Sequence, residues 1–390
     1  MDFSLTDEQR AMRQTIRAFV TKEVLPLEQE LLRRQRLDSG GVTRDEIREL
    51  QLMARAFGFW GPSTPVEYGG MGLSCVDQAL LHMELGKTLV RFHLGGEADN
   101  ILYDCDARQR ERYLLPTIEG ELVTCFAATE PDAGSDLTAL RTTARRVGDD
   151  WVVEGEKTFI THGTDADLAI VIARTDPDAD HRKAFTAFLI ERGMGFTSTP
   201  IATMGQMRPA VLGFDGVRVP AANVLGEVGQ GFELAMRWIG RGRYVQPSRA
   251  VGAAERLLGM AVEYAGLRRT FGVPIKEHQA IQWMIADSAA DLEAARYLTL
   301  LAAWSAEHHG ASRVATSAIA KLTAAVRAND IADRVLQIHG GMGYTQELPI
   351  QLWARDLRVL RIYEGSDEIQ RRTLAGQVFS GRYRLGGHLS

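Results

Sequence analysis

The spacing of apolar residues divides the chain into a helical part, a strand-rich part and a second helical part. In the first part, Thr6 to Gln9 forms a capping-box pattern, and apolar residues follow at intervals of three and four up to Val20. The same spacing predicts helices at 47–56, 78–85 and 108–115. A Gly- and Pro-rich stretch at 58–72 predicts a loop.

The pattern changes near residue 121 to short apolar runs typical of strands. These runs are 151–153, 168–173, 185–190 and 217–219. Turn clusters separate them and no helical pattern lies between them, which favours a small sandwich or barrel over alternating strands and helices. No G-x-G-x-x-G follows a strand and opens a helix, so a Rossmann nucleotide fold is not expected.

Helical spacing returns after Gly231 in long segments rich in small residues. The segments are 251–268, 279–304, 312–337 and 351–360. Small residues allow close approach of helices, so a bundle is expected. We therefore divide the chain into an N-terminal helical domain at 1–120, a central β domain at 121–229 and a C-terminal helical bundle at 230–390.

Composition changes this picture little. The 390 residues carry a formal net charge of −5 without a basic stripe, which argues against a nucleic-acid partner. No 18-residue apolar run and no signal-peptide pattern are present, so we expect no membrane span and a cytoplasmic location. Cys75, Cys105 and Cys125 are far apart and lack C-x-x-C spacing, so neither a disulfide framework nor a bound metal is expected.

The candidate chemistry centres on residues 360–370. Here Glu364 lies between Tyr363 and Gly365, and Ser366 has the character of a helix N-cap. A carboxylate among apolar neighbours loses solvation, which raises its pKa, and the glycine lets a ligand approach closely; both features suit a general base. A solvated loop carboxylate is the structural alternative, and most loop carboxylates are solvated.

Four upstream segments also combine polar, aromatic and glycine residues. They are 125–136, with Thr129-Glu130-Pro131 and Gly134-Ser135-Asp136; 155–163, with Phe159-Ile160-Thr161; 268–279, with Arg268-Arg269-Thr270-Phe271; and 337–344, with Gln337 and Gly340-Gly341. Each has a structural alternative, respectively a turn, an edge strand running into a turn, a helix terminus with arginine, and a glycine C-cap.

In this order, and ending in Ile-Tyr-Glu-Gly-Ser, the segments resemble the acyl-CoA dehydrogenase family over nearly the whole chain. The resemblance implies an α+β multidomain fold with an N-terminal helical domain, a central antiparallel β-sandwich or barrel and a C-terminal four-helix bundle. It also implies one FAD per subunit, a homo-oligomer built as a dimer of dimers, and an acyl-CoA substrate. Electrons would pass to an electron-transfer flavoprotein.

By the same resemblance, Glu364 removes the α-proton of the thioester while the β-hydrogen leaves as hydride to flavin N5. The backbone N–H of Glu364 and a ribityl hydroxyl would stabilise the thioester carbonyl oxygen. The implied substrate contacts are Ser135, Arg243, Tyr363 and Gly365. The residues implied to contact FAD are Phe126, Ala128, Thr129, Ser135, Phe159, Ile160, Thr161, Arg268, Thr270, Phe271, His278, Gln279, Gln337, Gly340, Gly341, Ser366 and Glu368.

Three departures from the family pattern bear on function. Gly242 stands where some members carry the base, so Glu364 has no rival there; Gly240 replaces a usual Asp; and Phe159 replaces a frequent Trp that the electron-transfer partner is thought to approach. A carrier-protein thioester, an oxygen-using flavin oxidase or monooxygenase, and a DNA-associated adaptive-response flavoprotein remain alternatives. Acyl chain length and branching stay open.

Overall fold

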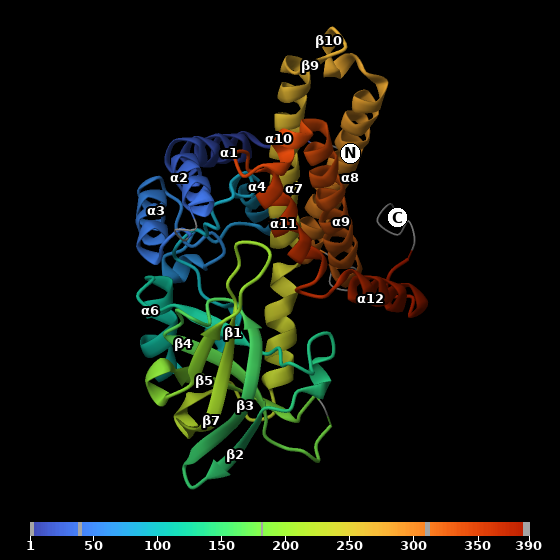
Figure 1. The fold of residues 1–390 in the computed structure, drawn as a ribbon. Coiled ribbons are helices and arrows are strands. Elements are labelled where there is room, and N and C mark those ends of the chain that lie inside the picture. The colour runs from blue at the N-terminus through green and yellow to red at the C-terminus, as the bar shows by residue number, and fades with distance from the viewer. Residues whose placement is uncertain (1–3, 38–40, 181, 309–312, 385–390) are drawn as a thin grey trace. The chain divides into compact units, whose positions relative to one another are not determined.

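The computed structural model describes residues 4–37, 41–180, 182–308 and 313–384. They form two compact units (Figure 1). The helical unit comprises Met1–Phe59, Leu73–Leu94 and Gly242–Ser390, and the sheet unit comprises Trp60–Gly72 and Gly95–Arg241. The helical unit thus combines the two ends of the chain.

Helices build the helical unit. They are α1 Asp7–Phe19, α2 Leu25–Arg36, α3 Arg44–Ala56, α4 Cys75–Leu85, α8 Gln279–His308, α9 Arg313–His339, α10 Gly341–Tyr344, α11 Ile350–Arg358 and α12 Asp367–Phe379, with α7 Gly231–Leu267 starting in the sheet unit. The capping box predicted at Thr6 is confirmed. Helix α2 was not predicted; a π-helical turn at Val20–Val24 joins it directly to α1, so the two helices lack the separating loop that sequence patterns reveal.

Small residues form much of the core of this unit. Helices α8 and α9 pack against each other along their length, and α11 and α12 pack on α9. Buried alanines on three helices, Ala261 of α7, Ala295 of α8 and Ala328 of α9, lie in the common apolar cluster. Close helix packing through small side chains, as the composition predicted, therefore produces this bundle.

A buried ion pair ties the N-terminal helices to the C-terminal bundle. Glu28 of α2 is fully buried, and its carboxylate accepts hydrogen bonds from Arg256 of α7 at 2.7 Å and from the backbone N–H of Leu89 at 2.6 Å. A buried carboxylate needs such partners to offset its lost hydration. Parts of the chain more than two hundred residues apart thus form one unit.

The sheet unit contains one mixed eight-stranded sheet. Its strands are β1 Thr124–Ala127, β2 Thr143–Val147, β3 Asp150–Ile160, β4 Leu168–Arg174, β5 Phe185–Glu191, β6 Thr197–Pro200, β7 Ala210–Pro220 and β8 Val224–Leu225, with short helices α5 Ala107–Gln109 and α6 Leu115–Ile118. The order is β6-β7-β3-β2-β4-β5-β8, and β1 pairs with β4. Most pairings are antiparallel as expected, but β4 pairs in parallel with both β1 and β2.

Apolar cores cover both faces of the central strands. Along β4, Leu168, Ile170 and Ile172 join one cluster, whereas Ala169, Val171 and Ala173 join another. This explains the continuous apolar run at 168–173, since a strand buried on both faces loses its alternation. In the described chain, β3 pairs with β7 over most of its length but with β2 only at residues 150–154, so the segment from Gly155 has a strand on one side and runs into a turn, as its structural alternative expects.

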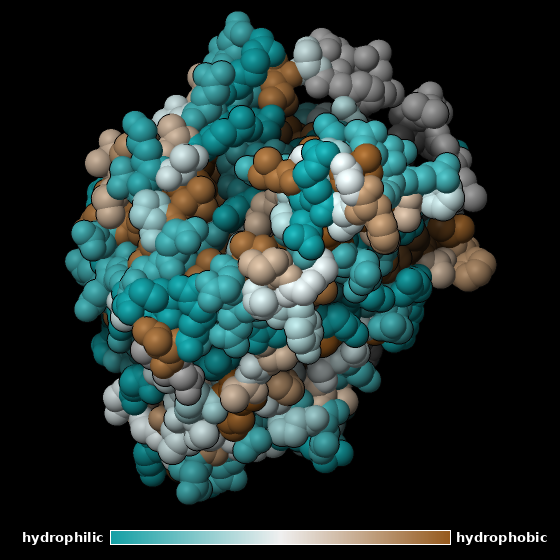
Figure 2. All heavy atoms as spheres, turned by 45° about the horizontal axis from the view of Figure 1, so that its top comes forward, coloured by the Kyte–Doolittle hydropathy of each residue, from teal (hydrophilic) through white to brown (hydrophobic). Residues whose placement is uncertain are grey.

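No helix in the described ranges is both long and apolar enough to cross a membrane. The face drawn in Figure 2 is mostly hydrophilic, and its apolar residues form small scattered groups. The apolar residues that the sequence pattern assigned to helix and strand interiors are thus largely used inside the two units.

Candidate active site

The turn that carries Glu364 has an unusual backbone. It follows the 3₁₀ turn Val359–Arg361 and precedes α12, whose N-cap Ser366 accepts a hydrogen bond from the N–H of Ile369. Glu364 has φ 52° and Gly365 has φ 87°, both in the left-handed region. This region is strained for a glutamate, and such strain concentrates at functional sites.

Side chains from α9 and α12 fix the backbone of this turn. Lys321 of α9 is 2% exposed, and its Nζ donates a hydrogen bond to the carbonyl oxygen of Gly365 at 2.6 Å. The Nε2 of Gln370 donates to the carbonyl oxygens of Glu364 and Gly365, each at 3.1 Å. The left-handed conformation is therefore held from two directions.

The carboxyl group of Glu364 is largely withdrawn from water. Its Oε1 lies 3.5 Å from the Nε2 of Gln246, and its Oε2 is buried without a hydrogen-bond partner in the described chain. Burial raises the pKa of Glu364 to about 7, against the opposing effects of Lys321, Gln246 and Arg243. A carboxylate in this state is near half-ionised at neutral pH, which suits proton transfer.

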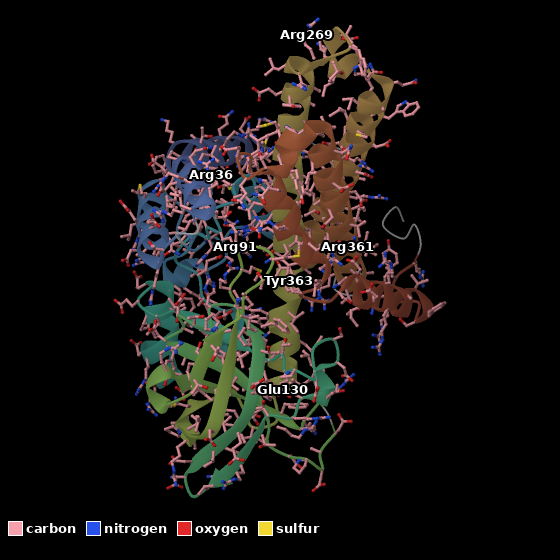
Figure 3. All side chains as sticks on the ribbon, viewed as in Figure 1. Arg36, Arg91, Glu130, Arg269, Arg361 and Tyr363 are labelled. Carbon is pink, nitrogen blue, oxygen red and sulfur yellow. The ribbon has the colours of Figure 1, made fainter. Side chains whose placement is uncertain are left out.

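Two further predicted residues flank the carboxylate. The hydroxyl of Tyr363 donates to Oε1 of Gln246 at 2.7 Å, and burial raises the pKa of Tyr363 above its ordinary value. The Nε of Arg243 is buried without a partner in the described part of the chain, and burial lowers the pKa of its guanidinium. Figure 3 shows Tyr363 next to Arg361, whose Nε pairs with buried Asp367 at 2.7 Å.

In the sheet unit, the structure brings the segments 126–135 and 159–161 together. The N–H of Thr158 donates to the carbonyl oxygen of Thr129 at 2.8 Å. The neighbouring residue Lys157 is fully buried and donates hydrogen bonds to Oε1 of Glu130 at 2.8 Å and to the carbonyl oxygen of Ala128 at 3.0 Å. Glu130 is labelled in Figure 3. The two predicted flavin segments thus form one surface region.

Glu130 organises the rest of this loop. Its carboxylate also accepts hydrogen bonds from the N–H groups of Arg141 at 2.6 Å and Thr142 at 2.8 Å. Burial opposes ionisation of Glu130, but the charge and hydrogen bond of Lys157 hold its pKa below the ordinary value. Burial lowers the pKa of Lys157 to about 8, against the attraction of Glu130.

The predicted residues of this region differ in what they offer a ligand. Ala128 and Ile160 are core residues at 3% and 2% exposure, so only their backbones can reach one. Ser135 and Thr161 are exposed, Thr129 is half-buried, and the Phe159 ring is 63% exposed at φ 58°. Exposed hydroxyls around an aromatic ring fit a flat heterocycle with a polar edge, such as the isoalloxazine of FAD.

Phe126 lies in an aromatic stack. Its ring lies 4.2 Å from that of Trp238 at an interplanar angle of 16°. The indole Nε1 of Trp238 donates to Oδ1 of Asp99 at 2.6 Å, and the hydroxyl of Thr124 donates to Oδ2 of the same residue at 2.6 Å. Hydrogen bonds to one carboxylate therefore orient both the tryptophan and the strand that carries Phe126.

The remaining predicted cofactor residues lie in three places of the helical unit. Arg268, Thr270 and Phe271 lie on or next to the hairpin of β9 Arg269–Thr270 and β10 Val273–Pro274. The Thr270 hydroxyl contacts Nε2 of His278 at 2.8 Å, and Phe271 is 97% exposed at φ 50°. Gln279 begins α8.

One place is the junction of α9 and α10, with Gln337, Gly340 and Gly341. Another is the start of α12, where Ser366 is the N-cap and Glu368 lies in the first turn. The hairpin lies at one end of α7 and α8, well away from the start of α12 (Figure 1). The hairpin and the start of α12 therefore lie in different parts of the helical unit. The exposed phenyl ring and the arginine fit an anionic ligand bearing an aromatic base.

Backbone strain supports the predicted positions. In the described ranges, the non-glycine residues at positive φ are Phe159, His162, Phe271 and Glu364. The sequence named three of these as site residues, and the fourth follows Thr161. Because left-handed conformations cost free energy without stabilising the fold, their coincidence with these segments favours a ligand role.

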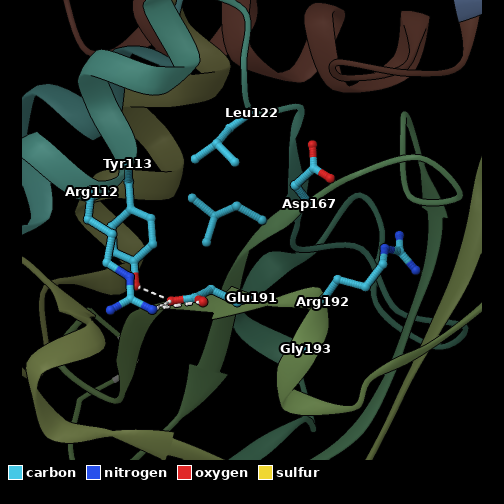
Figure 4. A pocket seen from close by; sticks show the side chains of 8 residues that line it. Arg112, Tyr113, Leu122, Asp167, Glu191, Arg192 and Gly193 are labelled. Atoms are coloured by element: carbon cyan, nitrogen blue, oxygen red, sulfur yellow. Dashed lines mark hydrogen bonds and ion pairs between the residues drawn. The ribbon is translucent and has the colours of Figure 1, made fainter.

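A separate pocket of about 390 Å³ lies elsewhere in the sheet unit (Figure 4). Arg112, Tyr113, Glu191 and Arg192 are among its lining residues. Its carboxylate is already paired, because Glu191 accepts from the Tyr113 hydroxyl at 2.6 Å and from Arg112 at 2.7 Å. Burial opposes ionisation of Glu191, but these partners hold its pKa below the ordinary value. We assign this pocket a structural role.

Sequence reasoning missed four residues that hold the candidate site: Lys157, Trp238, Gln246 and Lys321. Each acts on the predicted segments through a contact distant in sequence, and Lys157 itself belongs to the segment 155–163. Its charge was no signal in the sequence, because Glu154 and Glu156 lie beside it in the same strand. The other three lie in ordinary helical patterns.

Comparison with known proteins finds similarity along nearly the whole chain. Models of the N-terminal, middle and C-terminal domains of acyl-CoA dehydrogenase match residues 6–121, 125–216 and 229–379. The chain is 35% identical to (R)-benzylsuccinyl-CoA dehydrogenase of Thauera aromatica, covering 97% of each protein. It is also 35% identical to the mitochondrial short-chain specific acyl-CoA dehydrogenase of Mus musculus, covering 96% of this chain and 90% of that protein.

The fold matches solved structures equally well. Butyryl-CoA dehydrogenase of Megasphaera elsdenii superposes with a TM-score of 0.86 at 32% identity. The match covers 97% of this chain and all of that one. The expected architecture of N-terminal helices, a central β domain and a C-terminal bundle is therefore confirmed.

Proposed function

Because the chain belongs to the acyl-CoA dehydrogenase family, a family of FAD-dependent oxidoreductases, we propose that it oxidises the α,β-bond of an acyl-CoA thioester with Glu364 as the general base. The observation that carries this proposal is the state of the Glu364 carboxyl. Its Oε2 is buried, has no partner in the described chain, and belongs to a group with a pKa of about 7. It is the available proton acceptor of this turn.

Several residues around Glu364 contribute to removal of the α-proton. Lys321 and Gln370 hold the backbone, so the carboxyl group keeps its direction when substrate binds. Burial weakens hydration of the carboxylate, which makes it a stronger base towards a weakly acidic α-C–H. The α-proton passes to Oε2, leaving Glu364 neutral. Lys321 and Arg243 favour return to the carboxylate afterwards.

The segments 126–135 and 159–161 would hold the isoalloxazine of FAD. Thr129, Ser135 and Thr161 offer hydroxyls, and Phe159 offers an exposed ring. When bound, FAD supplies the acceptor for the hydride that leaves the β-carbon. The hairpin with Arg268, Thr270 and Phe271, together with Gln337, Gly340 and Gly341, would contact the FAD of a partner subunit. The separation of the hairpin from the start of α12 supports this shared arrangement and hence a homo-oligomer.

We infer that Arg243 binds an anionic group of the substrate. Its buried Nε has no acceptor in the described chain, and a buried N–H without an acceptor costs free energy. A carboxylate on the acyl chain would satisfy it, as would a thioester carrying a phosphate nearby. The relatives include a benzylsuccinyl-CoA and a short-chain acyl-CoA dehydrogenase, so both substrate types belong in the test.

For the electron acceptor, we propose an electron-transfer flavoprotein. Phe159 supports this, because its aromatic ring is 63% exposed next to the proposed flavin segment. A protein acceptor needs such an accessible edge, whereas an oxygen-using enzyme needs only a path for a small molecule. Comparing reoxidation by oxygen and by an electron-transfer flavoprotein separates the two chemistries.

The proposed reaction is tested by mixing the purified holoprotein anaerobically with a panel of thioesters. The panel contains short straight-chain, branched, aryl-substituted and carboxylated acyl-CoAs, and the same acyl groups on a carrier protein. We expect at least one acyl-CoA to bleach the flavin absorbance and to yield the 2-enoyl-CoA. If no thioester bleaches it, the chain is not an acyl-CoA dehydrogenase in function.

A further inference from the structure

Gln246 of α7 contacts both residues of the Tyr363–Glu364 pair. Its Oε1 accepts a hydrogen bond from the Tyr363 hydroxyl at 2.7 Å, and its Nε2 lies 3.5 Å from Oε1 of Glu364. It lies one helical turn after Gly242, on the same side of the helix, and its side chain is half-buried. Neither the sequence pattern nor the proposed proton transfer required a polar residue at this position.

The chemistry of an amide fixes how Gln246 faces its two partners. A tyrosine hydroxyl that stays protonated is a donor to the amide oxygen, and burial keeps Tyr363 protonated by raising its pKa. Once the oxygen faces Tyr363, the NH₂ end must face Glu364. Tyr363 therefore selects the amide orientation in which Gln246 donates to the carboxylate.

We propose that Gln246 is a positioning residue that holds Oε1 of Glu364 and leaves Oε2 as the oxygen that receives the substrate proton. Tyr363 acts through it, by keeping the amide in the donating orientation. This inference rests on the proposed role of Glu364 as the base and adds which of its oxygens reacts. The unpartnered state of Oε2 and the contact at Oε1 are the two observations that separate the oxygens.

The charged groups around Glu364 come from several elements. Lys321 of α9 and Arg243 of α7 both favour the carboxylate, and buried Asp367 of α12 offsets part of the charge of Lys321. None of these changes when Gln246 is replaced. Because an N–H donor stabilises the anion, its removal raises the pKa of Glu364, and a larger fraction is protonated and inactive at pH 7.

The test compares Gln246→Met with wild type in the holoenzyme, using a thioester that bleaches the wild-type flavin. The rate of anaerobic flavin reduction is measured from pH 5.5 to 9.5. A second readout is deuterium exchange at the α-carbon of the bound thioester after dithionite has reduced the flavin, which reports proton removal without hydride transfer. Gln282→Met is the matched control, because Gln282 lies exposed on α8 and its side chain donates to the Lys276 carbonyl, away from Glu364 in sequence.

We expect the acid limb of both profiles to move up by about one pH unit in Gln246→Met. At pH 7 the rate then falls about five- to tenfold and recovers at alkaline pH, while the KM is unchanged. Gln282→Met keeps the wild-type profile. A Gln246→Met profile that does not move, even with a lowered melting temperature, would show a merely structural role and overturn the proposal.

Tyr363→Phe gives an independent arm if Gln246→Met does not fold. Without the Tyr363 hydroxyl, the side-chain amide of Gln246 is free to rotate. The acid limb of the pH–rate profile should therefore move to higher pH, but by less than in Gln246→Met. The double variant moves no further than Gln246→Met alone, because Tyr363 acts through Gln246. If the two substitutions shift the acid limb additively, or if Tyr363→Phe leaves the limb where it is in wild type, Tyr363 does not act through Gln246. A wild-type flavin that no thioester bleaches refutes the proposed function instead.

Discussion

Replacing Lys157 by methionine probes how the sheet unit holds its proposed flavin loop. Lys157 is fully buried in β3 and donates to Glu130 at 2.8 Å and to the Ala128 carbonyl at 3.0 Å. Methionine matches the length of the lysine stem but cannot donate a hydrogen bond. The variant therefore leaves a buried carboxylate with the two backbone N–H groups of Arg141 and Thr142 as its donors.

The cost follows from the broken pair. Removing one partner of a buried ion pair costs about 3–5 kcal/mol, because the remaining charge stays desolvated. Most of that cost comes from the stranded carboxylate, so adding Glu130→Gln to Lys157→Met should recover about half of it or more. The loop from 126 to 135 depends on the same contacts, so we also expect faster FAD loss from Lys157→Met.

The assay is urea unfolding at one fixed protein concentration, followed by tryptophan fluorescence and circular dichroism, with FAD release measured separately. Lys183→Met, which replaces an exposed lysine of the same unit, is the control and should change stability by less than about 0.5 kcal/mol. If Lys157→Met is as stable as wild type, or the double variant is no more stable than the single, the buried pair does not have the role described here.

Three further predictions concern the turn at Glu364. The rate of flavin reduction should rise with pH through about 7 and then level off, because burial raises the pKa of Glu364 to about 7 and the carboxylate is the active form; a flat profile from pH 5.5 to 8.5 contradicts this. Folding raises the pKa of the Glu364 carboxyl, so its ionisation destabilises the folded wild-type protein as the pH rises from about 4.5 through 7. The free energy of unfolding of Glu364→Gln in urea should therefore exceed that of wild type by about 2–3 kcal/mol at pH 8, and the difference should vanish below pH 4.5. Equal free energies of unfolding at pH 8 refute this. Gly365→Ala should cost about 1–3 kcal/mol and slow reduction, since Gly365 has φ 87° and a Cβ there would lie 2.5 Å from Nε2 of Gln370. Gly376→Ala in α12 meets open space and should be neutral or stabilising.

Much of the fold was accessible from the sequence because local rules determined it. The Thr6 capping box and the Ser366 N-cap depend on neighbours three residues away, and both are present. The runs at 168–173 and 185–190 are β4 and β5. The parallel pairings of β4 were not accessible, since they depend on which strands the intervening chain brings together. Helix α2 was missed because no turn signal separates it from α1.

For the candidate site, the sequence pointed to the segments but not to what holds them. Glu364 was named from its motif, yet its left-handed backbone and buried Oε2 follow from Lys321, Gln370 and Gln246. Lys321 and Gln246 reach the turn through helix packing, which leaves no signature in a single sequence, whereas Gln370 lies within the segment 360–370 itself. Lys321 and Gln246 also affect the pKa of Glu364, so the motif alone predicts the identity of the base but not its protonation.

The role of Glu364 is tested most directly by anaerobic single turnover of Glu364→Gln against wild type. The substrate is the best acyl-CoA of the panel, and flavin content is measured before mixing. We expect the variant to keep its FAD and bleaching to slow by about a thousandfold or more, since a glutamine cannot accept the α-proton. Bleaching at the wild-type rate by the FAD-loaded variant would contradict it and place the base elsewhere in the chain.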